Sequence, residues 1–229
     1  MRTLREIRNG ILVGAPEGQS IYQDASVVTK GGTVYKCQID RDDICQQIPF
    51  DRTNNVGFVG SPLDEKSGQW FGATLSTSGR TDGPVVACAP RYVWFTKDLN
   101  RKDPVGTCFV SNGAFDSFEE YSPCRTSSVH QQSLENRPAV FSTREGKAPD
   151  DDSYIGYSTV VGHFKQGEEF EGIAVGMPRG NKLKGKVLLF TWNLHNYKNI
   201  TISNQIGSYF GYSLTAADVN GDKKLKTHS

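Results

Sequence analysis

The sequence contains no long hydrophobic run. No stretch of about eighteen consecutive apolar residues occurs among the 229 residues, so we expect no membrane-crossing segment in this chain. The N-terminal segment MRTLREIRNGILVG has basic residues but only a short apolar run at residues 11–13, where a signal peptide needs a longer apolar core. As written, the chain is therefore expected to carry neither a signal peptide nor a transmembrane segment.

The sequence also lacks an excess of charge of either sign. Twenty-six Lys and Arg balance twenty-five Asp and Glu, which leaves a formal net charge of +1. No global electrostatic attraction to nucleic acid or to an anionic membrane surface follows from such a balance. We therefore expect no nucleic-acid partner and no direct membrane contact by this segment.

Catalytic signatures are missing as well. The four His residues are scattered, and neither a His-Glu-x-x-His nor a Gly-x-Ser-x-Gly pattern is present. No Cys-x-x-Cys pair occurs, which argues against zinc ligation. The sequence thus shows no catalytic constellation, and we expect that the chain is not an enzyme.

Five cysteines are present, and four of them stand at spacings that suit local disulfides. Cys37 and Cys45 are eight residues apart around a polar loop, and Cys88 and Cys108 are twenty residues apart at the ends of two strand-like runs. Such disulfides persist only in oxidising compartments. Buried free thiols are the alternative, and Cys124 is left over in either case.

The triplet Asn199-Ile200-Thr201 matches the acceptor sequence for N-glycosylation. Because such triplets also arise by chance, this one is weak evidence on its own. Glycosylation at Asn199 is therefore an expectation that depends on export of the chain.

Glycine and aromatic residues are plentiful. The chain has 24 Gly, 10 Pro, 12 Phe and 9 Tyr, which indicates many tight turns and sheet surfaces that pack together. Long apolar patterns with the helical period are hard to find. The composition therefore favours an all-β fold.

A repeat runs along the chain. Each unit has an aromatic-x-Gly opening, an apolar run that ends in Pro, and a Gly followed by a β-rich strand. The openings lie at residues 70–75, 154–160 and 209–214, and the Pro-ended runs at 11–16, 85–90 and 173–178. A repeated meander with Gly and aromatic residues is typical of β-propeller blades, and a sandwich with coincidental turns is the alternative.

This series of motifs resembles the FG-GAP repeat of integrin α subunits. The resemblance is carried by Gln69-Trp70-Phe71-Gly72-Ala73-Thr74, by Asp151-Asp152-Ser153-Tyr154-Ile155-Gly156, and by Tyr209-Phe210-Gly211-Tyr212-Ser213 with the segment DVNGD at 218–222. It covers nearly the whole chain, from Gly10 to Asp222, and is closest to the subgroup without an inserted A domain that recognises Arg-Gly-Asp ligands. It implies an all-β fold, a partial β-propeller.

The resemblance implies one incomplete propeller over residues 1–229, with about two complete blades and two partial ones. We expect a partial blade at 10–50, a blade at 70–125, an irregular segment or remnant of a missing blade at 126–153, a blade at 154–195 and a blade start at 209–222. The step from Gly72 to Gly156 is 84 residues, whereas that from Gly156 to Gly211 is 55. A blade takes roughly 60 residues, so most of one blade is missing unless 126–153 is a real long loop. Open edges should then make the isolated chain fold poorly.

The segment DVNGD at residues 218–222 is a candidate Ca²⁺ loop. Asp218, Asn220 and Asp222 place side-chain oxygens at alternate positions, and Ca²⁺ takes about six to eight oxygen ligands. The resemblance implies that such loops bind Ca²⁺ and usually end in a carboxylate at the ninth position. Here that position is Lys226, which has no lone pair to donate when charged. We therefore expect an incomplete site, with a polar Asn-Gly turn as the alternative.

The acidic turn before Tyr154 is a candidate ligand site. The resemblance implies that Asp151, together with Asp152, could pair with the guanidinium of a ligand's Arg, because a carboxylate accepts a bidentate contact from that group. A solvated acidic turn is the alternative. The second Arg-binding acid of the family would lie in the missing segment.

The resemblance implies a role in cell adhesion. The expected protein is the extracellular part of a single-pass cell-surface receptor, which pairs with an integrin β subunit and binds an extracellular-matrix ligand of the Arg-Gly-Asp type. A truncated or mispredicted product without independent function is one alternative. An FG-GAP accessory domain of a secreted enzyme is the other, although the chain has no attached catalytic domain.

Overall fold

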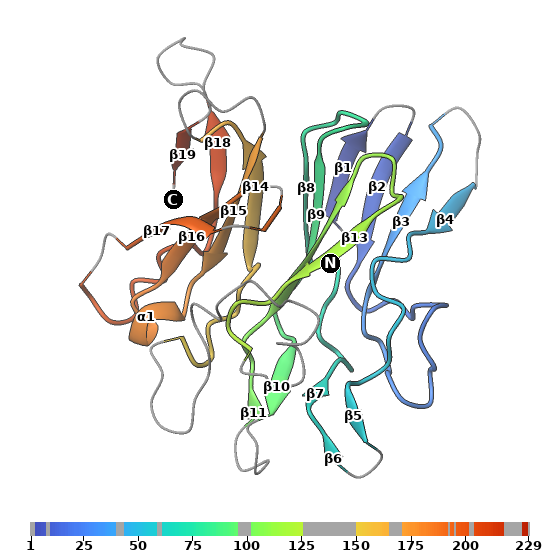
Figure 1. Cartoon of the computed structure of the whole chain (residues 1–229), viewed down its shortest axis with the longest axis horizontal. Helices are drawn as coiled ribbons and strands as arrows, with labels where there is room; N and C mark the ends of the chain where they lie inside the picture. The colour runs from blue at the N-terminus through green and yellow to red at the C-terminus, as the bar shows by residue number, and fades with distance from the viewer. Residues whose placement is uncertain are drawn as a thin grey trace.

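The protein folds almost entirely into antiparallel β-strands (Figure 1). The computed structural model describes residues 3–7, 10–39, 44–58, 61–95, 102–125, 150–164, 171–191, 193–194, 196–201, 204–217 and 226–228. Within these residues, three four-stranded sheets stand beside one another, and the beginning of a fourth unit follows. The expected all-β, partial-propeller fold is therefore the observed one.

The first sheet has the order β1-β2-β3-β4, and each strand pairs with its neighbour in sequence. Its strands are β1 (Thr3–Ile7), β2 (Gly10–Ala15), β3 (Thr33–Cys37) and β4 (Cys45–Gln47). The sequence predicted a partial blade that begins at Gly10. The structure adds β1 in front of it, with Ile7 opposite Gly10. No sequence motif marks β1, because the segment TLREI has no aromatic-Gly signature.

The second and third sheets repeat this meander. The second has the order β13-β12-β9-β8 and the third β14-β15-β16-β17. Their strands are β8 (Thr74–Thr77), β9 (Pro84–Ala89), β12 (Thr107–Asn112), β13 (Phe118–Tyr121), β14 (Ser158–Gly162), β15 (Gly172–Met177), β16 (Lys186–Phe190) and β17 (Asn196–Ile200). The Pro-ended runs of the repeat thus form the second strand of each sheet, β2, β9 and β15.

Shorter elements complete the fold. A small sheet, β11-β10-β7, and the hairpin β5–β6 lie at one end of the sheets (Figure 1). Their bounds are β5 (Gly57–Phe58), β6 (Ser61–Pro62), β7 (Asp64–Glu65), β10 (Val93–Phe95) and β11 (Lys102–Asp103). The short α1 (Gly180–Leu183) links β15 to β16, and Asn181 and Lys182 within it have left-handed backbone angles. The fourth unit begins with β18 (Thr215–Ala217), which pairs with β19 (Lys226–His228).

The sheets meet along their first strands. Strand β1 contacts β8, β8 contacts β14, and β14 contacts β18. Strands β4, β13 and β17 lie at the other edge of their sheets. First strands that neighbour one another around a common line, with the other strands radiating outward, are the arrangement of blades in a β-propeller. We refer below to the three sheets as blades A, B and C.

A glycine contact joins each blade to the next. Gly32 forms an isolated parallel bridge with Phe71, and Gly185 forms the equivalent bridge with Phe210. At the junction between blades B and C, the amide of Ile155 donates a hydrogen bond to the carbonyl of Val105 at 2.8 Å, just before Gly106. A Cβ on any of these three glycines would overlap the backbone of the next blade's motif. All three have φ between +75° and +94°, which glycine adopts without steric cost.

A hydroxyl two residues after the motif glycine strengthens the same junctions. The Thr74 hydroxyl donates to the carbonyl of Gly156 at 2.6 Å, and the Ser158 hydroxyl donates to the carbonyl of Gly211 at 2.8 Å. Both residues stand at the start of a first strand, β8 or β14. In blades B and C, the aromatic-Gly-x-Ser/Thr motif therefore connects the blade to the unit that follows.

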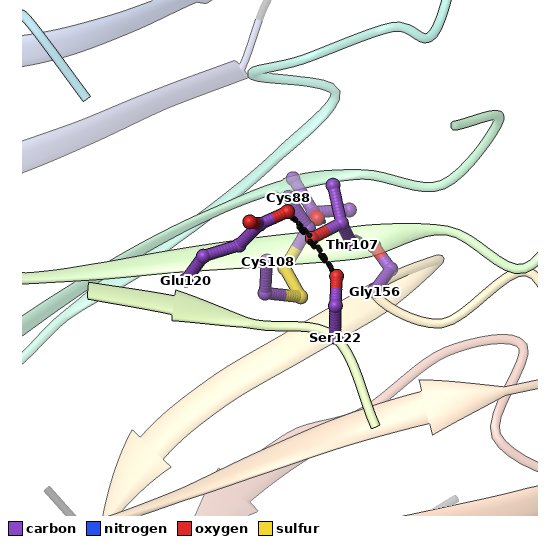
Figure 2. Close-up of a disulfide and its surroundings, with 7 residues drawn as sticks. Cys88, Thr107, Cys108, Glu120, Ser122 and Gly156 are labelled. Carbon is purple, nitrogen blue, oxygen red and sulfur yellow. Dashed lines mark hydrogen bonds between the residues drawn. A yellow bond between two sulfur atoms is a disulfide. The ribbon is translucent and has the colours of Figure 1, made fainter. Parts of the chain in front are cut away.

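Both disulfides that the spacing predicts are present. Cys37 pairs with Cys45 across β3 and β4, and Cys88 pairs with Cys108 across β9 and β12. Figure 2 shows the second disulfide beside Gly156, where an added Cβ would meet both cysteine side chains. The Thr107 hydroxyl next to it donates to Glu120 at 2.8 Å and also contacts the Ser122 hydroxyl. This disulfide therefore links the two central strands of blade B, and it also packs against the start of blade C.

One apolar core runs through all three blades. Leu12, Val86 and Ile173 are fully buried in it and come from blades A, B and C in turn. The rings of Tyr121 and Phe190 stack across the junction between blades B and C, with centroids 3.9 Å apart. The three sheets therefore share their buried surface. No helix among the described residues is long and apolar enough to span a membrane.

Candidate docking site

The acidic turn at residues 150–154 is anchored on blade C by a buried ion pair. The Asp150 carboxylate lies 2.7 Å from the Lys186 ammonium, and it also accepts the amide of Asn181 at 2.9 Å. The side chains of Asp150 and Lys186 are only 5% and 7% exposed. Asp150 therefore holds the turn in place, and its carboxylate is not accessible to a ligand.

The same turn is anchored on blade B by hydrogen bonds. The Ser153 hydroxyl donates to the carbonyl of Val105 at 2.9 Å, and the Tyr154 amide donates to the carbonyl of Pro104 at 3.1 Å. Ser153 is completely buried. Blades B and C thus both determine the position of the residues that follow Asp150.

Two residues of the turn have left-handed backbone angles. Asp152 and Tyr154 both have φ of +54°, a region that residues other than glycine seldom adopt. Such angles persist only where the surrounding structure imposes them, and they are common at binding sites. Here they place the Asp152 carboxylate 3.8 Å from the Arg179 guanidinium, which also lies 5.3 Å above the Tyr154 ring.

The pairing of an aromatic ring with an arginine recurs in blade B. The Arg91 guanidinium lies 4.6 Å above the Trp70 ring, and Trp70 has φ of +64°. Trp70 and Tyr154 are the first aromatic residues of their motifs, and Arg91 and Arg179 each follow the Pro that comes directly after the second strand of the blade. Cation–π contacts of this kind contribute about 0.5–1 kcal/mol at exposed sites.

The predicted ligand residues lie in the middle of the turn. Asp151 and Asp152 are both partly exposed, and the Asp152 side chain is 42% exposed. A surface ion pair such as that between Asp152 and Arg179 is worth about 0–1 kcal/mol, so an incoming guanidinium could compete with Arg179. The role of Asp151 and Asp152 in ligand binding stays a prediction. The contact of Arg179 with Asp152 was not predicted from the sequence.

A cluster of tyrosines lies next to the first strands of blade C and the fourth unit. The rings of Tyr157 and Tyr212 are 4.7 Å apart and their hydroxyls are 3.2 Å apart, while the Tyr209 ring stands edge-on to that of Tyr212. The hydrogen bond to Tyr212 raises the pKa of Tyr157 to about 12. Tyr209 and Tyr212 are 53% and 54% exposed.

Exposure differs among the positions of the aromatic-Gly motif. The position directly before the glycine is buried between the blades, because Phe71 and Ile155 are 4% and 0% exposed. The first position and the position after the glycine are less buried: Tyr209 and Tyr212 are exposed, and Trp70, Tyr154 and Tyr157 are half-buried. The sequence contains a signal for this burial: the residue directly before the glycine has a side chain without polar atoms in all three motifs.

The remaining predicted site residues are in different places. Asp218, Asn220 and Asp222, the candidate Ca²⁺ ligands, lie outside the described residues, between β18 and β19 in the sequence. In the part of the chain that the structure describes, no group of three or more His, Cys, Asp or Glu side chains could hold a metal ion. Asn199 lies in β17 and is exposed.

Comparison with known proteins identifies the family. No family model matches the sequence. The chain is 38% identical over 280 residues to integrin alpha-PS2 of Drosophila melanogaster, 33% identical over 269 residues to integrin alpha-8 of Homo sapiens, and 31% identical over 260 residues to integrin alpha pat-2 of Caenorhabditis elegans. Each match covers 93% of this chain. The chain belongs to the integrin α family.

The integrin α chain described here spans only 20–25% of the length of these relatives. Each of the three alignments is also longer than the 229 residues of the whole chain, so the relatives contain residues in the matched region that have no counterpart here. Membership of this family agrees with the expectation that the chain is not an enzyme.

Cys124 lies beside the acidic turn and is not part of a disulfide. It is fully buried, and the Ser153 hydroxyl lies 3.4 Å from its sulfur. Burial raises the pKa of the Cys124 thiol from its ordinary value of 9.0 to about 12. The reactive thiolate is therefore roughly a thousandfold rarer than for an ordinary cysteine at neutral pH.

We expect Cys124 in the folded chain to resist alkylation. Iodoacetamide at neutral pH should label it much more slowly than a free cysteine peptide, and at the ordinary rate once the chain is unfolded in urea without reductant. Mass spectrometry of the peptide that contains Cys124 measures both rates. Rapid labelling of the folded chain would show that the junction between blades B and C is open.

Proposed function

We propose that this chain is the β-propeller region of an integrin α subunit that acts in cell adhesion. In this proposal it lies on the outside of the cell, pairs with an integrin β subunit and binds an extracellular-matrix ligand of the Arg-Gly-Asp type. Family membership supports the general role. The tyrosine cluster and the acidic turn support the two contacts.

The exposed tyrosine cluster is the observation that carries the proposed pairing with a β subunit. Tyr157 directly precedes β14, and Tyr212 lies shortly before β18. These two first strands contact each other. The cluster therefore lies at one end of the line along which the blades meet. Large, partly exposed aromatic residues are enriched at protein interfaces and often supply most of the binding energy.

The acidic turn supports the proposed contact with a basic ligand residue. Asp151 and Asp152 are partly exposed on a turn that two blades hold in place, so little further ordering is needed when a ligand binds. A carboxylate can accept two parallel hydrogen bonds from a guanidinium. The weak surface pair of Asp152 with Arg179 would exchange one guanidinium for another.

Ca²⁺ is the cofactor that we propose, with ligands from Asp218, Asn220 and Asp222. Their side-chain oxygens are of the type that Ca²⁺ prefers. Lys226, at the start of β19, stands where a further carboxylate would complete the loop. A bound ion would supply positive charge that draws the carboxylates together between β18 and β19.

A shortened form of the α chain is the second candidate. The alignments that exceed the length of this chain support it, as does the 84-residue step between Gly72 and Gly156. Such a form would lack most of one blade, and residues 126–153 would be the remnant of that blade. It would retain the blade junctions but need not act alone. An accessory domain of a secreted enzyme has no comparable support.

Pairing with a β subunit is tested by co-expression. The tagged chain should co-purify with a secreted integrin β ectodomain in buffer with Ca²⁺ and Mg²⁺ and be released by a chelator. Replacing Tyr209 and Tyr212 together by Ala should weaken the complex at least about 30-fold, because each ring is a candidate hot spot worth about 2 kcal/mol. The matched control is Ile21→Ala, an apolar side chain that is 72% exposed on blade A.

Co-purification that Ile21→Ala leaves unchanged and the tyrosine variant abolishes is the expected result. A chain that never co-purifies with any β ectodomain, with its two disulfides formed, would contradict the adhesion role and favour the shortened, non-functional form. Equal loss in both variants would assign the pairing to a different surface.

Ligand binding is tested on the complex with the β subunit. Asp151→Asn and Asp152→Asn should each reduce the affinity for a fluorescent Arg-Gly-Asp peptide, by about 10-fold or more if the guanidinium contact is charge-assisted. Asp82→Asn is the control, because Asp82 also pairs with an arginine, Arg80, and its side chain is 72% exposed on blade B. Unchanged affinity in both turn variants, measured by fluorescence polarisation, would remove this turn from the ligand site.

A further inference from the structure

Two tyrosines occupy equivalent positions in neighbouring units of the propeller. Tyr157 and Tyr212 each stand directly after the motif glycine of their unit, and the backbone amide of each donates to the carbonyl three residues earlier. Both therefore lie in the same kind of turn. The corresponding residue of blade B is Ala73, which has no ring. A pair of phenols at this position thus occurs between blade C and the fourth unit, whereas Ala73 excludes it between blades B and C.

The backbone on both sides of this pair is held in place. The Ser158 hydroxyl, one residue after the first tyrosine, donates to the carbonyl of Gly211, one residue before the second, at 2.8 Å. Ser158 is buried. The bridge between Gly185 and Phe210 joins the same two units. The two rings are therefore presented to each other by an ordered backbone, and they do not meet through the motion of a loop.

The two rings approach each other both at their hydroxyls and at their centres. The Tyr157 hydroxyl donates to the Tyr212 hydroxyl at 3.2 Å, and the ring centroids are 4.7 Å apart with the planes inclined by 38°. The ortho carbon of a phenol, next to the carbon that carries the hydroxyl, lies at a level between the oxygen and the ring centre. A close approach at both of these points therefore brings ortho carbons of the two rings close together.

We propose that Tyr157 and Tyr212 form a site of oxidative cross-linking, at which a haem peroxidase with hydrogen peroxide joins them as dityrosine. The oxidised haem removes one hydrogen atom, an electron and a proton, from each phenol hydroxyl. The two phenoxyl radicals couple by forming a bond between one ortho carbon of each ring. Each of these carbons then loses its hydrogen as a proton, and the phenol oxygen of the same ring regains a proton. Hydrogen peroxide takes up the two electrons and two protons and becomes two molecules of water.

Exposure and ring orientation distinguish this pair from the neighbouring Tyr209. Tyr212 and Tyr209 are 54% and 53% exposed, so an oxidant has equal access to both. The Tyr209 ring, however, stands at 89° to the Tyr212 ring, and the two centroids are 6.4 Å apart. Because this ring is both more distant and perpendicular, Tyr157 is the better coupling partner for Tyr212.

The cross-link would fix the fourth unit to blade C. A covalent bond between residues 55 positions apart restricts the unfolded chain, as a disulfide does, and so favours the folded arrangement. In the described residues, the fourth unit is only the two-stranded sheet β18–β19. A unit of this size buries little surface of its own and gains from such a link. The link forms within one chain, so it does not depend on the proposed adhesion role.

Peroxidase treatment of the full chain, with its two disulfides formed, tests the proposal. The chain is incubated at high dilution with a haem peroxidase and hydrogen peroxide, and the monomer is then separated by gel electrophoresis. The monomer should show the blue fluorescence of dityrosine. Mass spectrometry after digestion should find the peptides of Tyr157 and Tyr212 joined with the loss of two hydrogen atoms. Tyr157→Phe and Tyr212→Phe each remove one hydroxyl and should each lose this link completely.

Tyr209→Phe is the matched control, because Tyr209 is exposed to the same extent as Tyr212 and its ring contacts that of Tyr212. It should keep the link. Absence of the linked peptides in a chain whose two disulfides have formed, while free tyrosine in the same solution is coupled, would overturn the proposal. A link of equal yield in the chain unfolded in urea would overturn it as well, because chance encounters would then account for it. No β subunit is present in this experiment, so its failure is distinct from a failure of the proposed pairing.

Discussion

The contact between a glycine of one blade and the backbone of the next is the constraint on which this structure depends. Gly32 and Gly185 bridge directly to Phe71 and Phe210. The carbonyl before Gly106 accepts the amide of Ile155. A side chain at these glycines would overlap the neighbouring backbone, so the two backbones can come this close only because these residues are glycine. The Thr74 hydroxyl adds a hydrogen bond at the junction between blades B and C, and the Ser158 hydroxyl adds one between blade C and the fourth unit. The contacts between first strands and the shared core lie at these same junctions.

Buried ion pairs position the segments that lead into these junctions. Lys66 lies 2.8 Å from Asp51 shortly before the motif of blade B, and Lys186 lies 2.7 Å from Asp150 shortly before that of blade C. Removal of one partner of such a pair is costly, about 3–5 kcal/mol, because the remaining charge stays buried. At blade C this anchor holds a turn in which Asp152 adopts left-handed angles. The proposed ligand contact would therefore use a surface that is already ordered.

Much of the fold could be predicted because the motifs have direct backbone causes. The Pro-ended runs became β2, β9 and β15, and the cysteine spacings matched hairpin partners. Strand β1 was missed because its five residues carry no motif and are held mainly by pairing with β2. The roles of the three consecutive Asp residues could not be separated from the sequence. Only the approach of Lys186, 36 residues after Asp150, makes Asp150 a buried anchor and leaves Asp152 at the surface.

The amide of Ile155 offers the most direct test that a glycine contact joins blades B and C. It donates to Val105 across the junction, as the amide of Phe71 donates to Gly31 between blades A and B. Native-state hydrogen exchange, read by NMR or by overlapping peptides, should show both amides protected to the level of those in β9 and β12. Rapid exchange at Ile155, with β9 and β12 still protected, would show that blade C is not docked on blade B and would contradict the account.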